Sequence, residues 1–213
     1  MSRARPSRRR GAWLLTPVLV LLGSTAAAQE LPRRYAEALQ ALVSSRNPAE
    51  RATAAIALGH GFRDVPPSRD PRIAESLESA MVLDPDAVVQ VLAAYALCVR
   101  GDRRGVARVS LALRERGGVD PQEMLAPIAQ VPLSYLYRAL GYVGGPEATR
   151  FLIETSSAGV RSVRLVAIGA LGLVQDDPAA VDAALAALLR DDDPTIRGVA
   201  EFVSTDRARR AAK

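Results

Sequence analysis

VRLVAIGALG, at residues 163–172, is the fullest copy of a pattern that recurs along this chain. Its pattern is Val-Arg-x-x-Ala-x-x-Ala-Leu-Gly, which we call the cassette. Alanines three residues apart keep one face of a helix small, so a second helix can approach that face closely. The cassette therefore predicts a helix that packs against other helices.

Four further copies of the cassette occur along the chain. They read ERATAAIALG at 50–59, VQVLAAYALC at 89–98, PLSYLYRALG at 132–141 and IRGVAEFVST at 196–205. Their first residues are 39, 43, 31 and 33 positions apart. A period of roughly 30–45 residues is typical of helical solenoids, in which no single unit buries its apolar face alone.

Helix starts are marked by a capping side chain before proline, as in Asn47-Pro48, Asp70-Pro71 and Asp193-Pro194. No segment alternates with period two, so no sheet is expected. A long exposed connection is expected from Gly59 to Asp70. The predicted helices span 32–44, 48–59, 71–83, 87–99, 103–116, 121–130, 132–143, 146–156, 160–174, 178–190 and 195–207.

The cassette, its Asp-Pro or Asn-Pro start and its glycine-containing turn resemble HEAT repeats over nearly all of residues 31–207. The most similar type is the short HEAT-like repeat shared with phycobilisome bilin lyases. The third unit departs from the pattern, with Pro132 and Leu133 in place of Val and Arg. The resemblance implies an all-α, right-handed α–α superhelix of about five helical pairs, the last one incomplete. It implies a protein-binding scaffold and no shared catalytic residue, and bilin attachment is not implied by the repeat.

The N-terminus has the features of a secretory signal peptide over residues 1–28. Five arginines precede an apolar run from Ala12 to Leu22, and Ala26-Ala27-Ala28 fits a cleavage site before Gln29. The apolar run is shorter than the roughly 20 residues that span a bilayer. We expect cleavage after Ala28, a periplasmic or extracellular repeat domain over 29–213, and no stable membrane span after cleavage. A retained N-terminal anchor is the alternative.

Removal of this segment abolishes the net charge of the chain. The full sequence carries 28 basic and 23 acidic side chains, a formal net of +5. Five of the basic residues and none of the acidic ones lie in residues 1–28, so the remainder has 23 of each. Because phosphate neutralisation supplies much of the affinity for nucleic acid, a neutral domain disfavours that class of partner.

The inventory of reactive side chains argues against an enzyme, and no cofactor or metal is expected. His60 is the only histidine and stands at a helix end, which favours a structural role. Cys98 is the only cysteine and lies in an apolar helical stretch, which favours burial. The acidic runs 176–177 and 191–193 precede helix starts, so helix capping explains them better than calcium binding.

The sharpest site hypothesis is a basic patch formed by Arg103, Arg104 and Arg108. Arg104 and Arg108 are four residues apart on a predicted helix, so they are expected to share a solvent face. In HEAT proteins the second helices line the concave surface, which implies a basic patch for an acidic protein segment. The competing interpretation is an ordinary solvated helix face.

Tyrosines 135, 137 and 142 form a second candidate, because tyrosine is favoured at interface hot spots. Tyr135 aligns with Val166 and Tyr137 with Ile168 in the cassette, which favours core packing for both.

These observations lead to the expectation of an exported, non-enzymatic scaffold that binds another protein, of unspecified oligomeric state. The alternatives are an accessory subunit of an envelope enzyme or chaperone-like complex and, third, a nucleic-acid-binding HEAT domain.

Overall fold

The computed structural model describes residues 30–65, 68–115 and 132–212 of the 213-residue chain. The expected signal peptide, residues 1–28, and the expected helix at 121–130 lie outside these residues. The described residues form ten α-helices and a 3₁₀ turn, η1, and contain no strand. The bounds are α1 Arg33–Ser44, α2 Pro48–His60, α3 Pro71–Leu83, α4 Ala87–Val99, η1 Arg103–Gly105, α5 Val106–Glu115, α6 Leu133–Val143, α7 Gly145–Ser157, α8 Arg161–Leu171, α9 Pro178–Leu188 and α10 Pro194–Ala211.

The prediction of an all-α chain is confirmed, and most expected helices lie within a few residues of those observed. Two expectations were wrong in detail. The segment 103–116 begins with the 3₁₀ turn η1, which the Asp102 side chain caps at the Arg104 amide, and continues as α5 to Glu115. The last helix continues to Ala211 instead of ending at 207.

Aspartate and asparagine caps begin the helices as expected. The side chains of Asn47, Asp70, Asp86, Asp177 and Asp193 each accept a hydrogen bond from a backbone amide in the first turn that follows. Such bonds satisfy amides that have no partner inside the helix. Helix capping therefore accounts for part of each acidic run, at Asp177 and Asp193.

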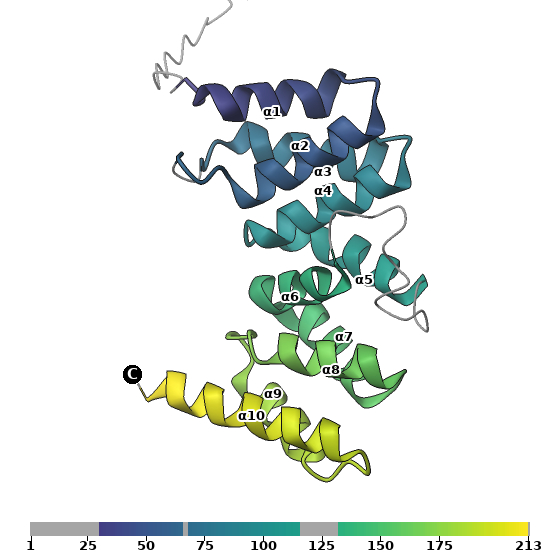
Figure 1. Ribbon diagram of the computed structural model, residues 1–213. Helices are drawn as coiled ribbons and strands as arrows, with labels where there is room; N and C mark the ends of the chain where they lie inside the picture. Colours follow the sequence, from purple (N-terminus) through teal and green to yellow (C-terminus); the bar gives the residue numbers. More distant parts are fainter. Residues whose placement is uncertain (1–29, 66–67, 116–131, 213) are drawn as a thin grey trace, which may run out of the picture. The chain divides into compact units, whose positions relative to one another are not determined.

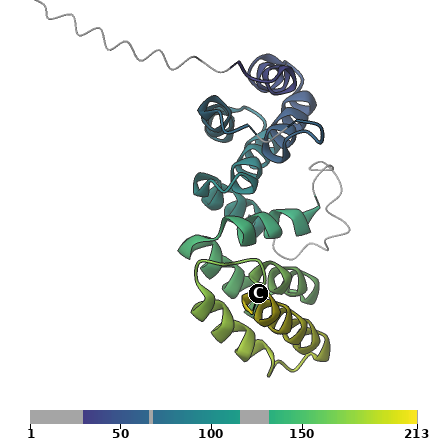
Figure 2. The same ribbon diagram turned by 90° about the vertical axis from the view of Figure 1, so that its left-hand side faces the viewer.

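The ten helices pack as two columns. The five cassette helices α2, α4, α6, α8 and α10 form one column, in which each contacts the next. In the second column α1 contacts α3, α3 contacts η1, and α5, α7 and α9 follow in contact. Figures 1 and 2 show this order from α1 at the top to α9 and α10 at the bottom. Among the described helices, none is both long and apolar enough to cross a membrane.

The core follows the cassette. The position four residues after the cassette start is buried in all five copies, at Ala54, Ala93, Leu136, Ala167 and Ala200. The position eight residues after the start is buried in the first four copies, all leucine. The third unit is therefore in register, despite its Pro132 and Leu133.

Glycine at the end of the cassette allows the next cassette helix to approach. A Cβ atom on Gly59 would lie 2.8 Å from the Cα atom of Ala96, and one on Gly141 would lie 2.3 Å from the carbonyl oxygen of Ala170. Ala96 and Ala170 occupy the same position in the second and the fourth cassette, each directly after the cassette that carries the glycine. The small residues of the pattern therefore set the separation between neighbouring helices of the column.

Arginine at the second cassette position connects one unit to the next. Arg51 donates from Nε and Nη2 to both carboxylate oxygens of Asp84, at 2.7 and 2.9 Å, and from Nη1 to the carbonyl of Ser45. The two side chains are only 11% and 6% exposed. Arg164 repeats the arrangement, with bonds to Asp191 and to the carbonyl of Ser156.

Candidate functional site

The three arginines of the predicted basic patch lie on η1 and the first turn of α5, but their side chains diverge. Arg103 and Arg104 are exposed and Arg108 is half-buried. Arg104 belongs to η1 and Arg108 to α5, so the two do not share one continuous α-helical face. Each of the three is engaged by a different partner within the chain.

Arg103 connects distant parts of the chain. Its Nη2 donates to Asp176 Oδ2 at 2.7 Å, and the same oxygen accepts the backbone amide of Gly145 at 2.6 Å. Gly144, beside it, has a φ of 60°, and a Cβ atom there would lie 2.6 Å from Asp176 Oδ1. Glycine is thus required where the α6–α7 turn meets Asp176.

Arg104 is held by two carboxylates, those of Asp102 and Glu78. The hydrogen bonds from the Arg104 side chain hold the pKa of Asp102 below its ordinary value, although partial burial of that carboxylate opposes the shift. The same Asp102 contact, followed by the charge of Glu78, raises the pKa of Arg104. The positive charge of Arg104 is therefore compensated inside the molecule.

Arg108 donates from Nη2 to the Gln90 side chain at 2.8 Å, while its Nε is buried without a hydrogen-bond partner among the described residues. Of the predicted patch, two cations pair with acids and the third is half-buried against α4. The contacts of these three arginines connect η1 and α5 to α3, to α4 and to Asp176 after α8.

The tyrosines separate into one core residue and two surface residues. Tyr137 is buried and stacks on Phe151 with ring centroids 6.1 Å apart, as expected from its alignment with Ile168. The core expectation for Tyr135 was wrong, since this side chain is 45% exposed. Tyr142 is 60% exposed.

Arg138 lies between the two exposed tyrosines. Its guanidinium carbon is 6.0 Å from the ring centre of Tyr135 and 5.9 Å from that of Tyr142. Its Nη2 also donates to the Tyr142 hydroxyl at 3.2 Å. These distances are those of cation–π contacts on both sides of one cation. We call Tyr135, Arg138 and Tyr142 the aromatic cluster.

A second polar pair lies on the neighbouring units. The Tyr95 hydroxyl and His60 Nε2 are 2.6 Å apart, which joins α4 to the end of α2. Tyr95 is buried, and burial together with nearby Tyr135 raises its pKa to about 12, while nearby Arg138 has a smaller opposite effect. The Tyr95 hydroxyl is therefore neutral near neutral pH. It lies close enough to Tyr135 and Arg138 of the aromatic cluster to interact with them electrostatically.

Among the described residues, Arg138 has no acidic partner, unlike the arginines of the neighbouring helix α8. Helices α4, α6 and α8 contain no aspartate or glutamate. On α8, Arg161 pairs with Asp193 and Arg164 pairs with Asp191. Within the described residues the contacts of Arg138 are tyrosines alone, and no carboxylate lies within ion-pair distance.

The described residues offer little reactive chemistry. Burial raises the pKa of the Cys98 thiol to about 12, so the reactive thiolate is not formed near neutral pH. Across residues 30–65, 68–115 and 132–212, no three His, Cys, Asp or Glu side chains are placed to hold a metal ion. His60 Nε2 is hydrogen-bonded to the hydroxyl of Tyr95, a side chain that is only 1% exposed.

Comparison with protein-family models gives no match, and comparison with curated proteins gives no significant match. The candidate site therefore depends on geometry and on the repeat pattern.

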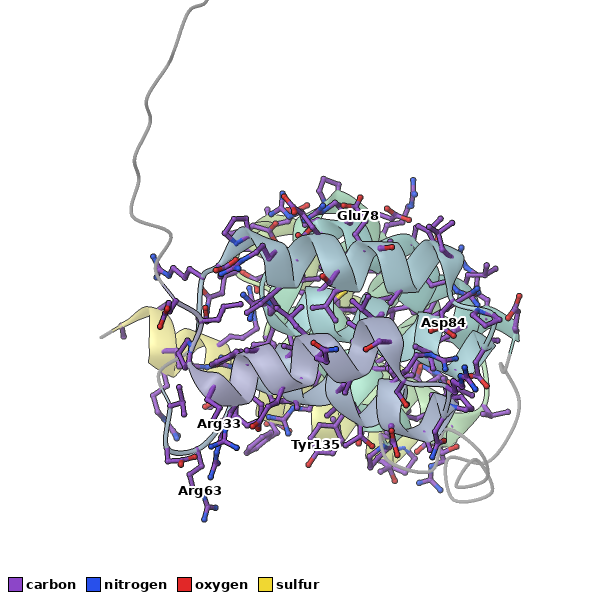
Figure 3. All side chains as sticks on the ribbon, turned by 90° about the horizontal axis from the view of Figure 1, so that it is seen from above. Arg33, Arg63, Glu78, Asp84 and Tyr135 are labelled. Carbon is purple, nitrogen blue, oxygen red and sulfur yellow. The ribbon has the colours of Figure 1, made fainter. Side chains whose placement is uncertain are left out.

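The sequence hypothesis placed the site on the second column, whereas the aromatic cluster lies on α6 of the cassette column. Seen down the stack in Figure 3, Tyr135 and Glu78, the partner of Arg104, lie on opposite sides. A signal for Arg138 was present in the sequence. It is the only charged residue at the sixth position after a cassette start, where the others are Ile56, Tyr95, Gly169 and Phe202.

Proposed function

We propose that this protein is an exported, non-enzymatic scaffold that binds another protein through the outer surface of a HEAT-like α–α superhelix. Five equivalent helices in one column support this proposal, because stacked copies of one helix form a continuous surface along the column. Stacked repeats of this kind provide extended binding surfaces in place of one deep pocket.

The observation that carries the proposal is the contrast between inward and outward cassette positions. The inward position four residues after the cassette start is apolar and buried in every unit. The outward positions of the third unit are two exposed tyrosines with an arginine between them. Tyrosine and arginine are over-represented among residues that dominate binding energy. Their exposure on the surface favours a role in recognition.

In-cell crosslinking of the tagged full chain, followed by mass spectrometry, tests this function. The proposal expects one partner protein to be recovered repeatedly, with crosslinks on the described repeat surface. Recovery of no partner, or turnover of a substrate by the purified chain alone, would contradict it.

Three further results separate the alternatives. Capture of an enzyme whose activity needs this chain would make it an accessory subunit. Binding to duplex DNA whose affinity falls steeply with salt would make it a nucleic-acid-binding domain. The first residue of the exported protein tests export, since Gln29 indicates cleavage after Ala28 and Met1 or Ser2 a retained N-terminus.

A further inference from the structure

We propose that the aromatic cluster is the binding site for a carboxylate side chain in an extended acidic segment of the partner protein, with an apolar side chain of that segment beside it. This inference rests on the proposed function and assigns it a surface and a partner chemistry.

Charge complementarity is the first argument. The guanidinium of Arg138 is exposed and contacts no carboxylate among the described residues, while the arginines of α8 are both paired. The helices on either side of α6 in the cassette column carry no acid that could rotate toward it. A carboxylate supplied by another molecule would therefore meet no repulsion from these helices and would replace water on Arg138.

Pre-organisation is the second argument. Rings on two sides and a bond to the Tyr142 hydroxyl restrict the guanidinium. An arginine has five N–H donors and this bond uses one, so a bidentate pair of donors remains for a planar carboxylate. Less side-chain entropy is lost when the donor is already held, and the neighbouring rings exclude part of the competing water.

The surface beyond the cation supplies the apolar half of the site. The positions equivalent to Arg138 on the next two helices are Gly169 and Phe202. A Cβ atom built on Gly169 meets no atom within 4 Å, and Phe202 is 71% exposed. A chain running from α6 toward α10 would pass the cation, then a position without a side chain, then an exposed phenyl ring.

Other occupants fit this surface less well. Nucleic acid binding requires several phosphate contacts, whereas α4, α6 and α8 present one cation without an acid. A second copy of the chain also carries exposed acids, such as Glu75 and Glu147, so self-association is an outcome that the light-scattering arm of the test separates. An acidic segment of a different protein is the occupant that the charges favour.

The test is a selection of phage-displayed random peptides on the immobilised full chain. Enriched peptides should carry Asp or Glu near Trp, Tyr, Phe or Leu. Arg138→Gln should weaken their binding at least tenfold, the loss of a hot-spot contact of about 1.4 kcal/mol. The matched control Arg104→Gln, which removes an arginine already paired with acids, should change it less than about twofold.

Further variants keep the result interpretable. Tyr135→Ala and Tyr142→Ala should each weaken binding with an unchanged melting temperature, because both side chains are exposed. Peptides without acids, or equal binding by Arg138→Gln and wild type, would overturn the inference. A doubling of mass in light scattering that Arg138→Gln abolishes would overturn it in favour of self-association.

Failure of the proposed binding site can be distinguished from failure of the proposed scaffold function. If in-cell crosslinking captures a partner that Arg138→Gln still binds normally, the site is wrong and the scaffold function stands. If crosslinking captures nothing, the scaffold function fails and the peptide selection alone decides the site.

Discussion

Two arginine-bearing regions of this molecule look alike in composition and differ in what their charges contact. In the region of η1 and α5, Arg103 and Arg104 pair with Asp176, Asp102 and Glu78. On α6, Arg138 contacts tyrosines alone among the described residues. The first region is rich in arginine but holds the fold together, whereas the second has one arginine and leaves its charge available.

The comparison extends along the chain. Arg51 and Arg164 tie neighbouring units together, and Arg100 donates to the carbonyls of Leu58 and Ser68, which fixes the long connection after α2. A high density of arginine in the sequence therefore reflects the internal hydrogen bonds and ion pairs that hold the repeat units together. A surface cation is identified only after these internal bonds are known.

The largest expected effect on stability comes from removal of a buried ion pair. Arg51→Ala leaves the Asp84 carboxylate buried without its partner and should lower the free energy of unfolding by about 3 kcal/mol. Arg138→Ala removes an exposed side chain and should change it by less than about 0.5 kcal/mol. Urea denaturation of both variants measures the difference, and equal losses would erase the distinction between structural and available arginines.

The next effect concerns inward and outward cassette glycines. Gly141→Ala places a Cβ atom 2.3 Å from the carbonyl oxygen of Ala170 and should cost about 2 kcal/mol, because two helices must separate. Gly169→Ala makes the same change on an open helix surface and should stabilise the protein by about 0.5–1 kcal/mol. Thermal melts compare the two, and a stabilised Gly141→Ala would disprove the close approach.

Lowering the pH is expected to have a smaller effect on stability. Burial disfavours the charged form of Asp84, but bonds from Arg51 and from the Asp86 amide outweigh it and hold its pKa below the ordinary value. The Arg164 bond, followed by the Asp193 amide, does the same for Asp191. Because these folded-state pKa values are depressed, their stabilisation is complete above the unfolded pKa of about 4 and is lost as pH falls below it.

Urea midpoints between pH 6 and pH 3 measure this loss. Asp84→Asn should be less stable at pH 6 and should lose less further stability on acidification than wild type. Glu37→Gln, which removes a carboxylate from an exposed i,i+4 pair, serves as the control and should keep the wild-type acid dependence. An unchanged acid dependence in Asp84→Asn would show that the pair is not titrating as described.

The sequence predicted the helices, their caps and the core because these depend on local chemistry and on period. Proline after aspartate marks a helix start, and repeated alanine marks a packed face. It did not predict which charges stay available. That outcome depends on pairs such as Arg103–Asp176, 73 residues apart, and no cassette position encodes the second partner. The prediction that Tyr135 is a core residue was wrong. Alignment with Val166 gives its position along the helix, whereas its exposure depends on which side chains of the neighbouring helix pack against it.

Site-specific photo-crosslinking in cells determines whether the aromatic cluster or the predicted basic patch contacts the partner protein. A photo-reactive amino acid is placed either at Tyr142, in the aromatic cluster, or at Arg108, in the predicted basic patch. We expect one partner-dependent adduct from position 142 and none from position 108. An adduct from position 108, or none from position 142, would show that the aromatic cluster is not the contact surface.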